Sequence, residues 1–584
     1  MKKTYFILVL VLAVVATVGS CKNSFLDIKP AGALDQNLLA NQKGLDALLI
    51  GAYSCLDGQG GPGGGWGSAT TNWVYGSIRG MEANKGTDAG DQPNINPLQT
   101  FSETATNDYL NDKWRNVYDA IARCNSVINV AAKALEAGSI TQDQATSYTL
   151  QAKVLRGWYH FDAWRMWDKI PYLDETTDPA TVTNSEDVKA KIIADLTAGT
   201  TLPLNMGAVG KFNKTVSEVL LAKALMQMNK DYAGALTLLN DAKATGKKPD
   251  GTNIGLAPTY GEIFDIANRN GLEVIYTVQY SVNDNSGGTN GGNGEVLNFP
   301  YKSGGSPGGC CGFFDPTQEF VNSFRTSGGL PLLDFSYNTL PVKNDQGLAK
   351  APATGPDPFV PDAGPLDPRL DWSVGRRGIP YWDWGKHTGA DWIRDQTYSG
   401  PYNPKKQVYK KSQEGTFTEV GNWTSGWTAN GYRMIRYADL LLLIAECQIE
   451  TNDLAGARTN INAVRARAAN PAGFVMDGAV PAANYVINQY PAAGAPFDTQ
   501  ANARAALRME RKLELGTEGH RFFDLNRWGI TVTELNRVLT YEKTMPWGQN
   551  LYLNGAAIVG PEDVTYPIPQ RQIDLSNGNI VQNR

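Results

Sequence analysis

The sequence has few residues of the kinds that bind metals or act in catalysis. Its three histidines, His160, His387 and His520, lie far apart, so no zinc motif with a fixed histidine spacing is present. No G-x-S-x-G element occurs, and residues 207–212 (GAVGKF) fail the phosphate-binding GxxxxGK[ST] pattern in spacing and in the last residue. We therefore predict no metal ligands and no cofactor, and a structural calcium ion remains open.

The sequence also lacks an excess of basic residues. Its 53 lysines and arginines stand against 58 acidic residues, which gives a formal net charge of -5. Proteins that bind nucleic acid usually carry a basic surface, so we predict no nucleic-acid partner. Hydrophobic residues make up 42% of the 584 residues and charged residues 19%, a composition that supports a large core. This length allows three or four units of about 150 residues.

After residue 20 the sequence has no apolar run that approaches the roughly 20 residues needed to cross a bilayer. The apolar run at residues 5–18 follows two lysines and leads into Val18-Gly19-Ser20-Cys21. This arrangement predicts a secretory signal peptide over residues 1–20, and its end resembles a bacterial lipobox. We expect the mature chain to begin at a lipidated Cys21 that anchors it to a membrane. The alternative is ordinary secretion with an incidental cysteine.

Five further cysteines form an odd set without C-x-x-C spacing, so we predict neither a disulfide scaffold nor a metal site. Cys124 and Cys447 fall within helical patterns, and we interpret them as small buried residues. The adjacent Cys310 and Cys311 form either a disulfide or a pair of loop thiols, and the sequence leaves this open.

Helical periodicity is strong in three blocks of the chain. They cover residues 108–135 and 147–168, then 185–244, and finally 435–468 and 501–525. The segments 231–235 (DYAGA) and 453–457 (DLAGA) share a pattern that resembles tetratricopeptide units, with Asp453 near a capping position. We predict a mainly α-helical scaffold of stacked helix pairs; the alternative is a plain helical bundle.

Between these blocks, residues 251–432 are rich in loops. A strand is predicted near residues 273–280 (EVIYTVQY), and glycine-rich segments follow at 286–294 and 303–312. Prolines cluster at 352–368, and a similar glycine-rich loop occupies residues 58–67. Long loops in a compact protein are usually functional or disordered, and tryptophans within these loops favour function.

Several segments together resemble the SusD family of surface lipoproteins. Residues 510–529 (ERKLELGTEGHRFFDLNRWG) resemble its C-terminal E-R-x-x-E-L-x-x-E-G-x-R-x-x-D-L-x-R-W pattern, and residues 436–446 its R-x-A-[ED]-x-L-L-x-x-A-E helix. Further similar elements are the D-P-R sequence at 367–369, Tyr566-Pro567-Ile568-Pro569 followed by Asn577 and Gln582-Asn583, and Ser24-Phe25-Leu26-Asp27 after the lipobox. The loops of residues 251–432 match no general pattern of the family.

This resemblance implies about four tetratricopeptide-like repeats and an irregular, loop-rich half with short strands. We divide the chain into the signal peptide 1–20, an N-terminal SusD-like region 21–250, a loop-rich ligand-binding region 251–432 and a C-terminal SusD-like region 433–584.

The resemblance also implies a lipid-anchored protein on the cell surface, in the outer membrane. It would capture oligosaccharides without catalysis and deliver them to a SusC-like TonB-dependent transporter. Some family members bind peptides, and this cargo remains an alternative.

The C-terminal motif is dense in charged residues, but we interpret them as structural. Helical spacing predicts ion pairs among Glu510, Glu514, Arg511 and Lys512, and between Arg521 and Asp524 three residues apart. A surface glycoside hydrolase would instead use two carboxylates, for which Asp383, Asp391 and Asp395 are the residues to consider. Nothing in the sequence indicates their separation or a raised pKa, so hydrolysis stays a minor alternative.

Tryptophans in loops are the main candidates for ligand binding. Trp158, Trp164 and Trp167 have near-helical spacing and are interpreted as packing residues. Other tryptophans, including Trp423 and Trp427, lie in loops or beside glycines, where an indole ring can lie against the C–H face of a sugar while polar groups bind its hydroxyls. The candidate ligand-binding residues are Trp66, Asn72, Trp73, Tyr280, Trp382, Asp383, Trp384, Trp392 and Arg394. The alternative is that these rings attach loops to the scaffold.

Overall fold

The computed structural model describes residues 36–58, 66–301, 305–352, 354–421, 424–552 and 559–584. The predicted signal peptide, Cys21 and Trp423 lie outside these residues, so the anchoring prediction stays a prediction, as does the division into three regions. Within the described residues, no helix is both long enough and apolar enough to span a bilayer.

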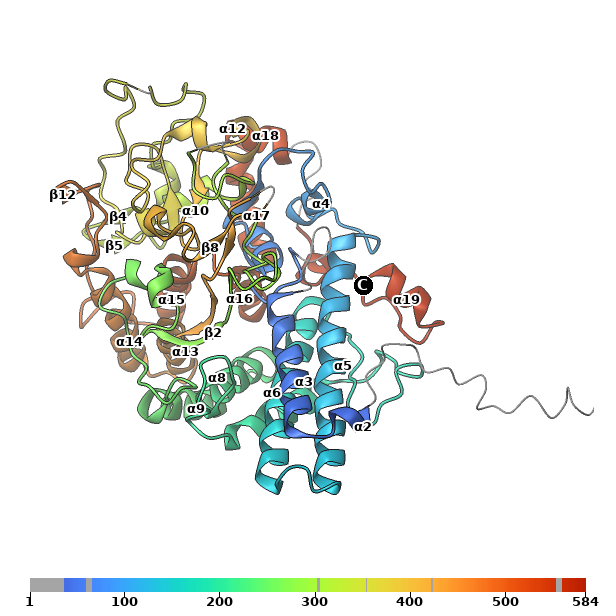
Figure 1. The fold of residues 1–584 in the computed structure, drawn as a ribbon. Coiled ribbons are helices and arrows are strands. Elements are labelled where there is room, and N and C mark those ends of the chain that lie inside the picture. The colour runs from blue at the N-terminus through green and yellow to red at the C-terminus, as the bar shows by residue number, and fades with distance from the viewer. Residues whose placement is uncertain (1–35, 59–65, 302–304, 353, 422–423, 553–558) are drawn as a thin grey trace, which may run out of the picture.

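A continuous stack of helices forms one side of the molecule (Figure 1). Each of its members packs against the next, except that α14 and α15 both pack on α13. They are α3 (Gln42–Ser54), α5 (Asp108–Glu136), α6 (Gln142–Trp167), α7 (Lys189–Ala198), α8 (Lys214–Ala224), α9 (Tyr232–Thr245), α13 (Tyr437–Glu450), α14 (Leu454–Ala468) and α15 (Gln500–Leu515). The stack confirms the predicted helix-pair scaffold, and its helices lie within the periodic blocks to within a few residues at each end, apart from α3, which no periodic block covers.

The repeated D-x-A-G-A pattern is a helix start. Asp231 and Asp453 are N-caps, and their carboxylates accept hydrogen bonds from the backbone N–H of Gly234 at 2.8 Å and of Gly456 at 2.9 Å. A Cβ atom at either glycine would approach the capping carboxylate to 2.3 or 2.1 Å. In these two helices the capping carboxylate lies so close to the third helical residue that glycine fits there best.

The other half of the molecule contains short elements joined by loops, as predicted for residues 251–432 (Figure 1). Its sheets are antiparallel pairs: β1 (Ala83–Gly86) with β3 (Phe313–Pro316), β2 (Val274–Val278) with β10 (Tyr432–Arg436), β4 (Thr326–Ser327) with β5 (Leu330–Pro331), β6 (Val374–Gly375) with β7 (Asn403–Pro404), β8 (Thr418–Glu419) with β9 (Trp427–Thr428), and β11 (Met476–Asp477) with β12 (Val480–Pro481). The strand expected near residues 273–280 is confirmed as β2, and its partner β10 leads directly into α13.

Short helices fill the remaining gaps. They are α2 (Gln36–Leu39), α4 (Ile95–Gln99), α10 (Gln318–Asn322), α11 (Leu370–Ser373), α12 (Gln396–Ser399), α16 (Arg521–Trp528), α17 (Thr531–Glu542), α18 (Pro546–Tyr552) and α19 (Gln570–Leu575). The closing segment returns to the N-terminal helices, where Tyr566 donates a hydrogen bond to the carbonyl of Tyr75 at 3.0 Å and Asn583 donates one to the carbonyl of Trp167 at 2.6 Å. The two ends of the described chain thus share one core.

The cysteines and helical tryptophans mostly follow their interpretations. Cys124 and Cys447 are buried free thiols, and Cys310 and Cys311 form a disulfide. Trp158 and Trp167 are buried in the main core, but Trp164 is only half-buried. Trp164 lines a cleft that is described further below.

A buried network of ion pairs connects the two halves. It contains five cations and five carboxylates among the described residues: Arg369, Arg436, Arg465, Arg467 and Lys406 with Glu273, Asp367, Glu510, Glu514 and Glu518. At its centre Glu514 accepts hydrogen bonds from Arg369 at 3.0 Å, from Arg436 at 2.5 Å and from Arg467. The D-P-R element, the start of α13 and the C-terminal motif therefore meet at one site.

The predicted structural role of these charges is confirmed, but most of the predicted partners were wrong. Arg521 pairs with Glu534 at 2.9 Å rather than with Asp524, and Arg511 bonds Asp439 and Asp524, each at 2.8 Å. Helical spacing places charges on one face, but these long side chains reach carboxylates on other elements. Burial makes such tertiary partners necessary, because an unpaired charge in the interior is very costly.

We expect Glu514→Gln to lower the free energy of unfolding by about 3 kcal/mol, because three buried arginines would lose a shared charge. Calorimetric unfolding of the variant beside Glu136→Gln, an exposed position on α5, measures this effect. An unfolding midpoint equal to that of the Glu136→Gln control would contradict the importance of the network.

The network should also make stability depend on pH in acid. Burial by itself would raise the pKa of Glu518, but the charges of Arg436 and Lys406 outweigh it and lower the pKa from 4.5 to about 2. The stabilisation is therefore present above pH 4.5 and is lost as the pH falls through about 2. Between about pH 5 and about pH 3, the unfolding midpoint of Glu518→Gln should fall less steeply than that of the unmodified chain. Equal slopes would contradict this assignment.

Candidate functional site

The nine predicted site residues lie in three different places. Trp66, Asn72, Trp73 and Tyr280 lie in or beside the main core, and Arg394 pairs with two aspartates. Trp392 is buried in a small apolar cluster against which Trp382 and Trp384 pack, and these two lie with Asp383 on a surface loop. The structure therefore does not join them into one surface, and each place is described by itself.

At the first place, the expectation of exposed rings is wrong for Trp73 and Tyr280, which are buried, while Trp66 is half-buried. Trp73 is 2% exposed, packs edge-on against Phe313 and Phe314, and donates its indole N–H to the carbonyl of Trp66 at 2.8 Å. Asn72 is buried and donates to Asp162 at 3.1 Å, and Tyr280 is also buried. These side chains attach the loop to the scaffold, because the glycines around them let the backbone lie close to the core.

The second place also serves packing and charge balance. Trp392 is 4% exposed, and its ring lies edge-on to Tyr381 and to His387 at centroid distances of 5.5 and 5.1 Å. Arg394 forms ion pairs with Asp88 at 2.8 Å and with Asp91 at 2.5 Å. Its charge is thereby neutralised by the protein itself, and the expectation of an exposed ring is wrong for Trp392.

The third place contains an open groove of about 520 Å³ with two tryptophans in its wall. Trp372 and Trp382 are half-buried, with ring centroids 5.0 Å apart and ring planes inclined by 60°. Each indole N–H donates to a backbone carbonyl, Trp372 to Gly473 at 2.7 Å and Trp382 to Lys405 at 3.3 Å. The two rings are thus held in place by their polar edges, and part of each remains accessible in the groove.

Polar groups surround these rings. The groove is lined by Thr259, Gly261, Glu262, Asp265, Trp372, Trp382, Asp383, Lys410, Ser412, Ala472 and Gly473. The Lys410 ammonium lies 5.5 Å from the centroid of the Trp382 ring and pairs with Asp265 at 2.5 Å. The exposed Glu262 carboxylate forms no ion pair with another described residue. The groove therefore offers acceptors and donors around an apolar surface.

The two aspartates of the groove are suited to accept hydrogen bonds. Burial would raise the pKa of Asp383, but the side chain and backbone N–H of Ser412 and the backbone N–H of Lys411 outweigh it and lower the pKa. For Asp265, burial is likewise outweighed by Lys410 and by hydrogen bonds, so its pKa is also lowered. Both carboxylates are therefore ionised near neutral pH and serve as acceptors rather than as proton donors.

Sequence reasoning missed Trp372, which forms half of the aromatic wall. Its one local signal is its position three residues after the D-P-R arginine, next to the proline-rich segment. Nothing in the local sequence indicates that its ring meets Trp382 and Gly261, because these contacts arise only from the tertiary packing of separate loops.

Trp384, by contrast, lies outside the groove. It is half-buried, its ring packs edge-on against Tyr409 at a centroid distance of 5.8 Å, and its N–H donates to the carbonyl of the same residue at 2.9 Å. Lys411 lies 5.9 Å from its ring centroid. Trp384 thus resembles Trp382 in its burial, its hydrogen bond to a backbone carbonyl and its nearby lysine. Unlike Trp382, it does not line the groove.

A second and larger cavity of about 810 Å³ lies between α3 and the loop after β2. It includes Tyr53, Asp57, Asn290 and Asn293 but no tryptophan. The Tyr53 hydroxyl already accepts from the Phe212 N–H at 2.7 Å, and Asp57 accepts two hydrogen bonds from Asn293 at 3.0 and 3.1 Å. Its polar groups are mostly engaged with the protein, so the tryptophan groove is the better candidate.

The stack of helix pairs, with a loop-rich half that carries an aromatic groove, defines a helical-repeat fold. The C-terminal half of the chain, residues 272–584, matches a family model described as SusD family, and residues 24–241 match one described as starch-binding associating with outer membrane. The first match covers more than half of the chain. The chain belongs to the SusD family.

Individual relatives are distant in sequence. The SusD-like protein P25 of Formosa agariphila is 22% identical over 480 residues, which cover 80% of this chain and 77% of that protein. A SusD superfamily protein from Bacteroides vulgatus superposes with a TM-score of 0.65 at 19% identity, covering 93% of this chain and 98% of the other. Surface glycan-binding protein A from Bacteroides thetaiotaomicron, solved in complex with laminarihexaose, gives a TM-score of 0.65 at 18% identity, with coverages of 93% and 99%. These similarities establish a shared fold.

Gly261 allows the Trp372 ring to take its position. A Cβ atom at residue 261 would lie 2.5 to 2.7 Å from three atoms of that ring, which its hydrogen bond to Gly473 holds in place. We expect Gly261→Ala to lower the free energy of unfolding by about 1–3 kcal/mol and to alter the near-UV circular dichroism of the tryptophans. Gly90→Ala, at an exposed glycine with ordinary contacts, serves as the control. Spectra that match in both variants would show that the ring is not fixed as described.

Proposed function

We propose that this protein captures oligosaccharides at the groove of Trp372 and Trp382 without any catalytic step. It then delivers them to a SusC-like TonB-dependent transporter in the outer membrane. A lipid on Cys21 holds it at the cell surface. The observation that carries this proposal is the pair of anchored indoles surrounded by ionised and neutral polar groups.

The geometry of the groove suits sugar rings. Because the N–H groups of both indoles are bonded to backbone carbonyls, ligand contact falls on the carbon faces and edges of the rings, which match the C–H face of a pyranose. Asp383, Glu262 and Lys410 lie within the same groove and provide partners for hydroxyl groups. A volume of about 520 Å³ is typical of small-molecule sites. Such contacts are individually weak and give an affinity that permits release to a transporter.

The similar proteins support an oligosaccharide as the cargo class. One solved structure of the same fold is described as a laminarin-binding SusD-like protein, and another contains laminarihexaose. Membership of the SusD family and the description of the matched N-terminal model support the outer-membrane location and the transporter partner. The signal and lipobox pattern at residues 1–21 supports the anchor.

Trp382→Ala tests the groove, and Trp384→Ala is its matched control. Both indoles are half-buried, both donate to a backbone carbonyl, and each has a lysine ammonium over its ring. Only Trp382 lines the groove. After a glycan array identifies a ligand of the mature chain, calorimetric titration should show binding by Trp382→Ala weakened about tenfold or more, since a stacking ring is worth about 1–3 kcal/mol. Trp384→Ala should bind like the unmodified chain.

Three outcomes would contradict the proposal. Equal binding by both variants would remove the groove as the site. Binding to a peptide library but to no glycan would establish the peptide alternative, and release of products from polysaccharide by the purified chain would establish the hydrolase alternative.

A further inference from the structure

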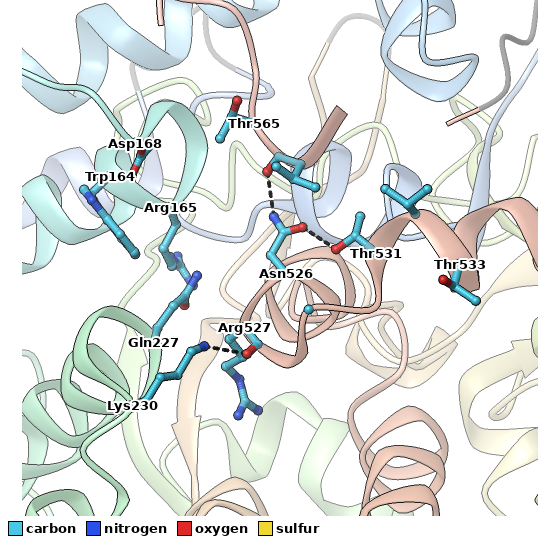
Figure 2. Close-up of a pocket in the computed structure, with 13 residues that line it drawn as sticks. Trp164, Arg165, Asp168, Gln227, Lys230, Asn526, Arg527, Thr531, Thr533 and Thr565 are labelled. Carbon is cyan, nitrogen blue, oxygen red and sulfur yellow. Dashed lines mark hydrogen bonds between the residues drawn. The ribbon is translucent and has the colours of Figure 1, made fainter. Parts of the chain in front are cut away.

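A third cleft, which shares no lining residue with the tryptophan groove, lies between the helical stack and the C-terminal helices. It has a volume of about 360 Å³ and is lined by Trp164, Arg165, Asp168, Gln227, Lys230, Asn526, Arg527, Gly529, Thr531, Val532, Thr533, Val564 and Thr565. Figure 2 shows Trp164, Arg165, Gln227 and Lys230 on one wall and Asn526, Thr531 and Thr565 on the other. The end of α6, the turn after α8 and the junction of α16 with α17 thus enclose one space.

The first wall presents several hydrogen-bond donors that the protein does not use. The Arg165 Nε atom is buried and has no hydrogen-bond partner, although the same guanidinium pairs with Asp162 through another nitrogen. Among the described residues, neither the indole N–H of Trp164 nor the side-chain amide of Gln227 has a hydrogen-bond partner. The Trp164 N–H and the Gln227 amide are therefore open to the acceptors of a ligand, whereas the Arg165 Nε atom is enclosed by the protein and its guanidinium lies against Trp158 and Phe523.

Two polar side chains of the second wall bond to the protein itself. Asn526 donates to the carbonyl of Val564 at 2.9 Å and accepts a hydrogen bond from the Thr531 hydroxyl at 2.5 Å (Figure 2). These bonds hold the Asn526 side of the cleft in shape.

Some charged side chains that line the cleft have ion-pair partners and others do not. Arg165 and Arg527 are neutralised by carboxylates outside the lining, Arg165 by Asp162 and Arg527 by Glu446 and Asp524. Lys230 has no ion pair with another described residue; its ammonium donates only to the carbonyl of Arg527 at 2.6 Å. One positive charge thus remains available for a ligand on the wall that holds the free donors.

Trp164 supplies an apolar surface beside these donors. Its ring is half-buried and lies nearly parallel to Phe161, with an angle of 11° between the planes and 6.4 Å between the centroids. The part of the ring that remains accessible lines the cleft. The Asp168 carboxylate, next to Trp164 in Figure 2, is exposed and forms no ion pair with another described residue, so it remains an acceptor for hydroxyl groups.

We propose that this cleft is a second binding site, which takes a single sugar ring bearing a carboxylate, of the hexuronate type. The ring lies against Trp164, the carboxylate is bound by Lys230 and the neighbouring donors, and Asp168 accepts from ring hydroxyls. A neutral sugar would leave the charge of Lys230 unmatched. The site is separate from the groove of the proposed function, with which it shares no residue.

The test uses the full mature chain carrying Trp382→Ala, so that the groove does not contribute. D-Galacturonate and D-galactose are the probes, and binding is followed by ligand-observed NMR titration. We expect galacturonate to bind about tenfold more tightly than galactose, because a charge-assisted hydrogen bond discriminates between them. Lys230→Gln should weaken galacturonate binding by about the same factor, whereas Lys169→Gln, at an exposed lysine outside the lining, should leave it unchanged.

Thermal unfolding of both lysine variants verifies that they are folded, and Gln227→Ala provides a second change in the cleft that removes no charge. Absence of galacturonate binding, or equal binding before and after Lys230→Gln, would overturn the site. Equal affinity for galactose and galacturonate would overturn the acidic class of ligand. Because the groove is disabled throughout, these results are independent of whether the groove binds glycans.

Discussion

The fold depends on a charge balance in its interior. Five cations and five carboxylates from separate segments are buried together, and each is tolerable there only because the others are present. A chain that placed one segment wrongly would leave a charge unpaired in a medium of low polarity, which costs several kcal/mol. The network therefore specifies how the loop-rich half sits on the stack of helices, a task that the apolar core alone would perform less selectively.

This constraint extends to the candidate groove through two adjacent lysines. Lys406 belongs to the network and pairs with Glu518 at 2.8 Å. Lys405, its neighbour, accepts the indole N–H of Trp382 at its carbonyl, and its ammonium lies 5.2 Å from the ring centroid of Trp372. The aromatic wall is thus connected through adjacent residues to the buried network of ion pairs. Binding surfaces built on loops need such support, because a loop alone does not hold two rings in a fixed relation.

The local sequence predicted the helices well and the binding surface poorly, for one physical reason. A helix such as α5 is specified by its own periodicity and by the Asn107 cap, all within one segment. Exposure of a loop tryptophan depends on distant residues: Trp73 is buried because Phe313 and Phe314 cover it, whereas Trp382 remains half-exposed beside Trp372. Both indoles lie near glycines or in loops, so composition does not distinguish them.

The amino-acid sequence by itself determined the helical scaffold, the helix starts at Asp231 and Asp453, and membership of the SusD family, since all of these reside in short-range patterns. Only the tertiary structure decided which carboxylate each arginine pairs with, which tryptophans face solvent, and that Trp372 completes an aromatic wall. Many of those outcomes depend on contacts between separate elements, some of them a hundred or more positions apart, such as Trp372 with Gly473 and Arg369 with Glu510. Burial and ion pairing depend on which segments come together in the folded protein, so a single local segment does not determine them.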